Sequence, residues 1–353
     1  MIAPFGFGNL LLLKKLERRG TPFGLQRTLT HPLSPFWRAL SSLVSIHESS
    51  IQTYVIRETA ADGEVYGVAQ LYERHGRPEA EIIYIAPSLS SQPGMSGLWA
   101  RLLTQVCKQA GQRGMQRLFA YTPWGGEEAR VFKEAGFMVY AREDILRFDR
   151  LPETRHDTPP EGLRRLRVED EGRLQELYSR ITPRRVQWAE GQLSPPTWSA
   201  MNNRGLLWGE EAYVLEDARS IELSAILQIM PGNSGHWLQL TVVPRTCGFS
   251  DELLNFGLER IAEWPAKPIY TAVREYQAGV LPALQAVGFE PFARQAILVK
   301  HTTVLIRDPL MKFLPAIEKR VGSSAPTVNI LNNETASEST SRAVAASIGA
   351  AHD

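Results

Sequence analysis

This sequence lacks long hydrophobic runs and has almost no excess of charge of one sign. The longest apolar run near the start, Leu10 to Leu13, ends at Lys14 and Lys15. It is far short of the ~20 residues of a membrane span and does not form the apolar core of a signal peptide. The formal net charge is +1, so no basic excess points to nucleic acid. We therefore expect a cytoplasmic protein with neither a membrane nor a nucleic-acid partner.

Cysteine is also scarce. Cys107 and Cys247 are the only two, and the seven histidines show no HxxxH spacing, which excludes a recognisable disulfide framework or metal site. What remains is an ordinary globular composition, 43% hydrophobic and 22% charged. The length of 353 residues exceeds the ~250 at which single cores stop growing. Two domains are therefore expected.

An internal repeat supports this expectation. The segments Gly136 to Leu146 and Gly288 to Leu298 lie 152 residues apart and share six of eleven positions. Such a period is too long for a solenoid unit and indicates a duplicated domain. We predict a first copy over residues 1–150 and a second copy over residues 162–307.

Both copies show the same order of predicted elements. In the first copy, β-rich runs, turn residues and helical spacing predict strands at 52–58, 65–72, 81–86, 117–121 and 137–148, with helices at 10–19, 35–44, 98–110 and 127–135. The second copy repeats the pattern with strands at 212–215, 221–229, 237–243, 268–273 and 292–301, and helices at 171–181, 197–202, 251–263 and 279–287. A Pro-containing linker is predicted at 151–161, a helix at 308–321 and a disordered tail at 322–353.

One loop of the second copy has the composition of an anion-binding loop. It reads Arg245, Thr246, Cys247, Gly248, Phe249, Ser250, and it lies between a predicted strand and a predicted helix. Small residues at such a place let a phosphate approach the unpaired N–H groups of the helix N-terminus. This loop and the element order resemble the GNAT acyltransferase superfamily, whose pyrophosphate loop is Q/R-x-x-G-x-G/A. The last position, Ser250, departs from that pattern.

The resemblance implies an α/β (α+β) fold of two tandem GNAT-like domains, each with a mixed, mostly antiparallel central sheet flanked by helices. It also implies acetyl-CoA or another acyl-CoA as co-substrate, and no metal. Residues 245–250 would hold the pyrophosphate. Val242 and Val243 would present backbone groups to the pantetheine arm and the thioester.

The matching place in the first copy runs from Gly94 to Trp99. Gly97 is retained, but Trp99 falls where the family has Gly or Ala. On one interpretation the indole fills the volume meant for phosphate, and the first copy binds coenzyme A poorly or not at all. On the other, the longer preceding turn moves the loop and Trp99 faces the core.

Catalytic residues are less clearly indicated. The resemblance places a proton-donating tyrosine four residues before the Gly of Gly-Phe, where this sequence has Phe132 and Leu284. Neither can donate a proton. Substitute acids in the second copy are Tyr276 and Tyr270, although Tyr270 also fits a plain core position.

Two glutamates are the candidate bases, Glu222 and Glu275, although each also fits an exposed salt bridge. The first hypothesis is an acyl-CoA-dependent N-acyltransferase acting on the amine of a small molecule or peptide, with the cofactor in the second domain. The alternative is a non-catalytic GNAT-like protein that binds coenzyme A or serves as a scaffold.

Overall fold

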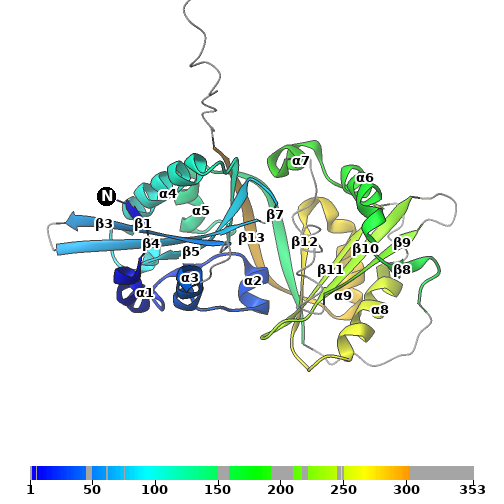
Figure 1. Ribbon diagram of the computed structural model, residues 1–353. Helices are drawn as coiled ribbons and strands as arrows, with labels where there is room; N and C mark the ends of the chain where they lie inside the picture. The colour runs from blue at the N-terminus through cyan, green and yellow to red at the C-terminus, as the bar shows by residue number, and fades with distance from the viewer. Residues whose placement is uncertain are drawn as a thin grey trace, which may run out of the picture. The chain divides into compact units, whose positions relative to one another are not determined.

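One mixed sheet of 13 strands runs through both copies in the computed structural model (Figure 1). The structure describes residues 2–302 except 5, 45–49, 61–62, 75, 150–158, 192–209, 217–221, 245–247 and 249. The strand order is β1-β3-β4-β5-β6-β13-β7-β12-β11-β10-β9-β8, and β2 pairs with β5. Among the described strands, most neighbours are antiparallel, and β5–β6 and β11–β12 are the parallel pairs.

The strands are β1 (Ile2–Pro4), β2 (Thr21–Pro22), β3 (Ile51–Ala60), β4 (Gly63–Glu73), β5 (Glu79–Ala86), β6 (Arg117–Pro123), β7 (Met138–Phe148), β8 (Leu163–Arg165), β9 (Glu211–Glu216), β10 (Leu223–Met230), β11 (His236–Val242), β12 (Ile269–Arg274) and β13 (Glu290–His301). The α-helices are α1 (Leu10–Leu16), α2 (Leu25–Thr30), α3 (Pro35–Val44), α4 (Met95–Gln112), α5 (Glu127–Glu134), α6 (Glu171–Ile181), α7 (Arg184–Glu190), α8 (Ser250–Ala262) and α9 (Leu281–Val287). A 3-10 helix, η7 (Glu275–Val280), leads into α9.

These elements confirm the predicted strands and helices that fall on described residues, with ends shifted by a few positions. The predicted helix at 308–321, the tail and the helix at 197–202 lie outside the described residues, as does most of the linker at 151–161. The short elements β2, α2 and α7 were not predicted. Each has fewer than eight residues, which is too few for a periodic pattern to emerge.

The last strands of the two copies are exchanged. Strand β13 of the second copy lies between β6 and β7 and is antiparallel to both, while β7 of the first copy pairs with β12 (Figure 1). Each copy therefore completes its neighbour's part of the sheet.

Equivalent residues of the sequence repeat pair with one another where the last strands are exchanged. Glu143 and Gln295 occupy equivalent positions of the repeat and are directly opposite one another on β7 and β13. The side-chain amide of Gln295 donates a hydrogen bond to the Glu143 carboxylate. Two equivalent strands that run antiparallel about a local two-fold axis meet at equivalent residues, which explains this pairing.

Helices cover both faces of the sheet. On one face α4 and α5 pack on first-copy strands, and α8 and α9 pack on second-copy strands. Helix α4 buries Leu98, Leu102, Val106 and Ala110, the spacing of an amphipathic helix. Residues 1–305 form one compact unit. The predicted domain boundary at 151–161 therefore stays a prediction.

Candidate cofactor site

A parallel pair of strands diverges in each copy. Strands β5 and β6 pair only from Glu79–Arg117 to Ile82–Ala120. Strands β11 and β12 pair only at His236–Ile269 and Trp237–Tyr270. Beyond these pairs, the two strands of each pair are no longer hydrogen-bonded to each other. We call the two interruptions the first gap, between β5 and β6, and the second gap, between β11 and β12.

The first gap is occupied by β2. Thr21 and Pro22 pair with Ile85 and Tyr84 of β5, and the backbone N–H of Phe23 donates to the Ile83 carbonyl at 2.9 Å. Strand β4 already pairs with the other edge of β5 at the same residues. Because a strand has only two edges, β2 lies on the side from which β6 has diverged.

Side chains fix this segment firmly. The Phe23 ring is 2% exposed and stands edge-on to Trp99, at 5.8 Å between centroids, and to Phe132, at 5.4 Å. The Tyr84 hydroxyl donates to the Leu16 carbonyl at 2.8 Å. A Cβ on Gly20 would lie 2.2 Å from that hydroxyl oxygen, so only glycine fits there. The first gap is filled by backbone and aromatic rings together.

The position of Trp99 resolves the alternatives left by the sequence. Helix α4 begins at Met95, so Gly97 and Trp99 lie inside the helix and not in the loop before it. Trp99 is 0% exposed, and its indole N–H donates to the Pro87 carbonyl at 2.7 Å. The interpretation that Trp99 faces the core is confirmed, and the interpretation that its indole fills a phosphate volume in the loop is wrong.

The second gap has a free backbone edge. Val243 donates its N–H to Ser224, towards β10, and His236 donates to Pro268, towards β12. Backbone groups alternate along a strand, so Leu240 and Val242 direct theirs towards the gap. Among the described residues, no strand pairs with this edge beyond Trp237. Across the gap, Nε2 of Gln239 donates to the Ala272 carbonyl at 2.9 Å, and η7, which follows β12, lies close to β11.

The predicted pyrophosphate loop lies at the far end of this edge. Arg245, Thr246, Cys247 and Phe249 are outside the described residues. A Cβ added to Gly248 would meet no atom within 4 Å. Ser250 is the first residue of α8 and is 0% exposed, yet its hydroxyl has no hydrogen-bond partner in the described part of the chain. Buried hydroxyls are normally bonded, so this one suits a ligand at the helix N-terminus.

The candidate tyrosines lie in different surroundings. The Tyr276 hydroxyl accepts a hydrogen bond from Arg274 at 2.9 Å, and burial raises the pKa of Tyr276. Tyr270 is 6% exposed and its ring packs on Phe292 at 5.4 Å. At the tyrosine position of the family, Phe132 and Leu284 are both buried and apolar.

Both candidate bases are engaged in surface ion pairs. Glu222 accepts from Arg180 at 2.7 Å, and Glu275 accepts from Arg185 at 2.8 Å. The catalytic roles of Tyr276, Tyr270, Glu222 and Glu275 stay predictions.

A buried ionic cluster beside Tyr276 was not found from the sequence. Glu190 is 2% exposed and accepts hydrogen bonds from Tyr140 at 3.0 Å, Tyr178 at 2.6 Å and Arg274 at 2.7 Å. Its members come from β7, α6, α7 and β12, so no local spacing signals it. Three donors on one carboxylate satisfy its buried charge.

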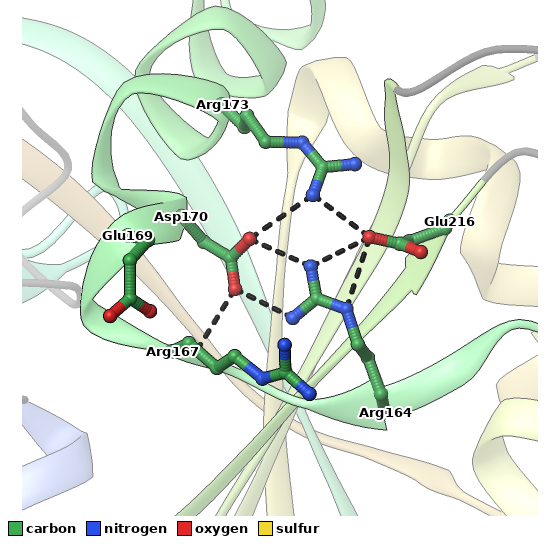
Figure 2. A pocket seen from close by; sticks show the side chains of 6 residues that line it. All are labelled: Arg164, Arg167, Glu169, Asp170, Arg173 and Glu216. Carbon is green, nitrogen blue, oxygen red and sulfur yellow. Dashed lines mark hydrogen bonds and ion pairs between the residues drawn. The ribbon is translucent and has the colours of Figure 1, made fainter.

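A second charged cluster lines a pocket of about 680 Å³ at the edge of the second copy (Figure 2). Arg164 donates to both oxygens of Asp170 at 2.7 Å and to Glu216 at 2.7 Å, and Arg173 contacts the same two carboxylates. Hydrogen bonding from Arg164 lowers the pKa of Asp170 to about 2. These carboxylates already occupy the two arginines, so the cluster fastens α6 to β8 and β9.

Comparison with known proteins identifies the fold. No protein-family model matches the sequence, and no curated protein matches it. Among solved structures, a tandem GNAT protein from the clavulanic acid biosynthesis pathway has a TM-score of 0.51 at 16% identity, with 86% of this chain and 98% of that chain covered. A GCN5-related N-acetyltransferase from Sphaerobacter thermophilus has a TM-score of 0.52 at 14% identity, with coverage of 86% and 95%. The chain therefore has a tandem GNAT-like N-acetyltransferase fold.

The described residues contain no group of three or more His, Cys, Asp or Glu side chains placed to hold a metal ion. Within the same residues, the helices are all too short or too polar to cross a membrane.

Proposed function

We propose that this chain, which has a tandem GNAT-like fold, is an acyl-CoA-dependent N-acyltransferase that binds acetyl-CoA or another acyl-CoA in its second gap. One observation supports the choice of copy: β2 fills the first gap, whereas no strand among the described residues fills the second. A pantetheine arm is an extended chain with amide groups, and it needs such an unpaired edge.

The residues of the second copy suit the parts of this cofactor. Gly248 and the buried Ser250 hydroxyl lie at the N-terminus of α8, where backbone N–H groups and the helix dipole favour phosphate. The predicted loop residues Arg245, Thr246, Cys247 and Phe249 complete that proposal. Backbone groups of Leu240 and Val242 are directed to the gap for the arm, while the N–H of Val243 is engaged with Ser224.

The reaction is aminolysis of a thioester. The amine nitrogen of a small-molecule or peptide acceptor attacks the acyl carbonyl, a C–N bond forms and the C–S bond breaks. The departing thiolate gains a proton and the amine loses one. Because neither Phe132 nor Leu284 can donate that proton, Tyr276 and Tyr270 remain the proposed acids, and Glu222 and Glu275 the proposed bases.

The second candidate function is a GNAT-like protein that binds coenzyme A without turnover. It is favoured by the apolar residues Phe132 and Leu284 at the tyrosine position in both copies. Calorimetric titration with acetyl-CoA, followed by a screen of amine acceptors, distinguishes an acyltransferase from a protein that binds coenzyme A without turnover.

Calorimetric titration with acetyl-CoA tests the proposal on a matched pair of variants. Gly248 and Gly94 lie at the starts of equivalent helices, and an added Cβ meets no atom within 4 Å at either position. We expect Gly248→Trp to abolish binding and Gly94→Trp to leave it unchanged. Thermal melts of both variants control for folding, since Gly94 has a φ of +82° and tolerates side chains poorly.

Three results would count against the proposal. If the wild-type protein binds neither acetyl-CoA nor coenzyme A, the acyltransferase hypothesis fails. Loss of binding in Gly94→Trp alone would move the cofactor to the first copy. Binding without transfer to any amine would favour the non-catalytic alternative.

A further inference from the structure

The strands that border the two gaps differ in how they pair with the next strand of the sheet. Strand β5 carries a register shift against β4 next to Ile83, and such a bulge turns backbone N–H groups out of the ladder. Strand β11 pairs with β10 without interruption from Trp237 to Val242. The second gap therefore offers no bulge-derived N–H groups from β11.

Gln239 supplies a donor at the place where such groups are missing. Its carboxamide projects from β11 two residues after the last paired residue, Trp237, and reaches the Ala272 carbonyl across the gap at 2.9 Å. Ala272 likewise lies two residues beyond Tyr270 on β12. Without Gln239, this carbonyl would be left unpaired where the strands separate. The side chain thus closes the narrow end of the second gap.

The length of the strand places this donor near the reacting end of a bound cofactor. A ligand whose phosphates lie at the N-terminus of α8 reaches the sheet along the free edge of β11, from Val242 towards Trp237. The four residue-to-residue steps from Gln239 to Val243 span ~13 Å. An arm that is anchored at α8 and extends over about this distance along β11 brings its thioester to the narrow end, beside Gln239.

We propose that Gln239 is the gate of the second gap and the hydrogen-bond donor to the acyl carbonyl. In the free chain its Nε2 donates to Ala272. When acyl-CoA enters, the carboxamide leaves Ala272 and donates to the thioester oxygen. As the amine attacks, that oxygen gains negative charge before the C–S bond breaks, so a donor aimed at it stabilises the transition state. This inference rests on the proposed function.

Binding measurements test it without knowledge of the acceptor. Gln239→Met keeps the volume and removes the donor, and it is compared with wild type by calorimetric titration with acetyl-CoA and with free coenzyme A. We expect acetyl-CoA to bind about three- to tenfold more weakly to the variant, since one neutral hydrogen bond is lost. Free coenzyme A has no acyl oxygen, so its affinity should stay the same or rise because the gate no longer has to open.

A matched control lies directly across the ladder. Gln228 on β10 pairs with Gln239 and is 6% exposed, but it does not border the gap. Gln228→Met should leave the ratio of the two affinities as in wild type. Thermal melts of both variants show whether a change comes from loss of folding, and Gln239→Asn provides a shorter amide if Gln239→Met is unstable.

A second measurement follows the amide itself. In protein labelled with ¹⁵N at glutamine, the side-chain NH₂ signal of Gln239, assigned by its absence from Gln239→Met, should shift on adding acetyl-CoA. Equal weakening of both ligands in Gln239→Met, or an unmoved signal in wild type that binds acetyl-CoA, would overturn the role of Gln239 and leave the proposed function intact. Failure of wild type to bind either ligand would overturn both.

Discussion

The two gaps lie at equivalent places in the repeat but are closed in different ways. In the first copy a backbone segment with a buried aromatic ring enters the gap, and in the second a carboxamide reaches across it. The difference arises from the connection between the opening helices. Eight residues, 17–24, join α1 to α2, whereas only Thr182 and Pro183 separate α6 from α7.

This comparison shows that one copy of a duplicated fold can fill its gap by lengthening one connection. The helix that follows β5 is still preceded by a glycine, Gly94, in open surroundings. The loop is thus not what closes the first copy. In the first copy, a chain segment that pairs with β5 fills the gap.

The largest expected effect comes from separating the two copies. Residues 1–149 expressed alone would lack β13, which pairs with both β6 and β7. We expect this fragment to show no cooperative thermal unfolding by circular dichroism. Co-expression with residues 159–302 should restore it. A cooperative transition in the isolated fragment would show that β7 can fold back on its own copy.

The next effect concerns the residue that fills the first gap. Phe23→Ala should lower the free energy of unfolding by about 3–5 kcal/mol, because the ring is 2% exposed and touches two buried aromatic rings. Urea denaturation measures the loss. Phe292→Ala, in the second copy, is the control: its ring is 43% exposed, so the change should be about 1 kcal/mol or less. Equal losses would contradict a packed first gap.

A smaller effect is a pH-dependent stability that we expect for the opening helix of the second copy, α6, and not for that of the first, α1. The folded pKa of Asp170 is about 2, below its ordinary 3.8, because Arg164 donates to it. Its stabilisation is therefore complete above pH ~4 and is lost as the pH falls towards 2. Asp170→Asn should cost about 1–2 kcal/mol at pH 7 and flatten this pH dependence.

Hydrogen exchange provides the measurement and its internal control. Amides of α6 should lose protection as the pH falls from 4 to 2, while α1, held by the buried apolar residues Leu13 and Leu16, should keep its protection relative to the intrinsic rate. An equal loss of amide protection in α6 and α1 would mean that the ion cluster does not act locally.

The smallest expected effects are those of Glu222→Gln and Glu275→Gln. Each carboxylate forms one exposed ion pair in the second copy, and such pairs contribute about 0–1 kcal/mol. Thermal melts should therefore change little. Acyl-transfer rates, measured once an amine acceptor is found, decide the catalytic prediction: a loss of about a hundredfold with unchanged stability would identify a base, and an unchanged rate would leave only the ion pair.

Several features of this protein follow from its sequence alone. The repeat at Gly136 and Gly288 indicated duplication, and periodicity located the longer strands and helices, because each of these depends on residues close together in the chain. The same local signals placed Gly248 and Ser250 at the start of a helix. The order of elements was enough to indicate a GNAT-like fold.

Tertiary structure decided the rest, because it depends on which distant edges meet. The exchange of β7 and β13 leaves no local trace, since either copy's last strand has the same pattern. Thr21–Pro22 is too short to be recognised as a strand, and only the divergence of β5 from β6 gives it an edge to pair with. Which gap is filled by a strand of the described residues was determined by packing between segments far apart in sequence.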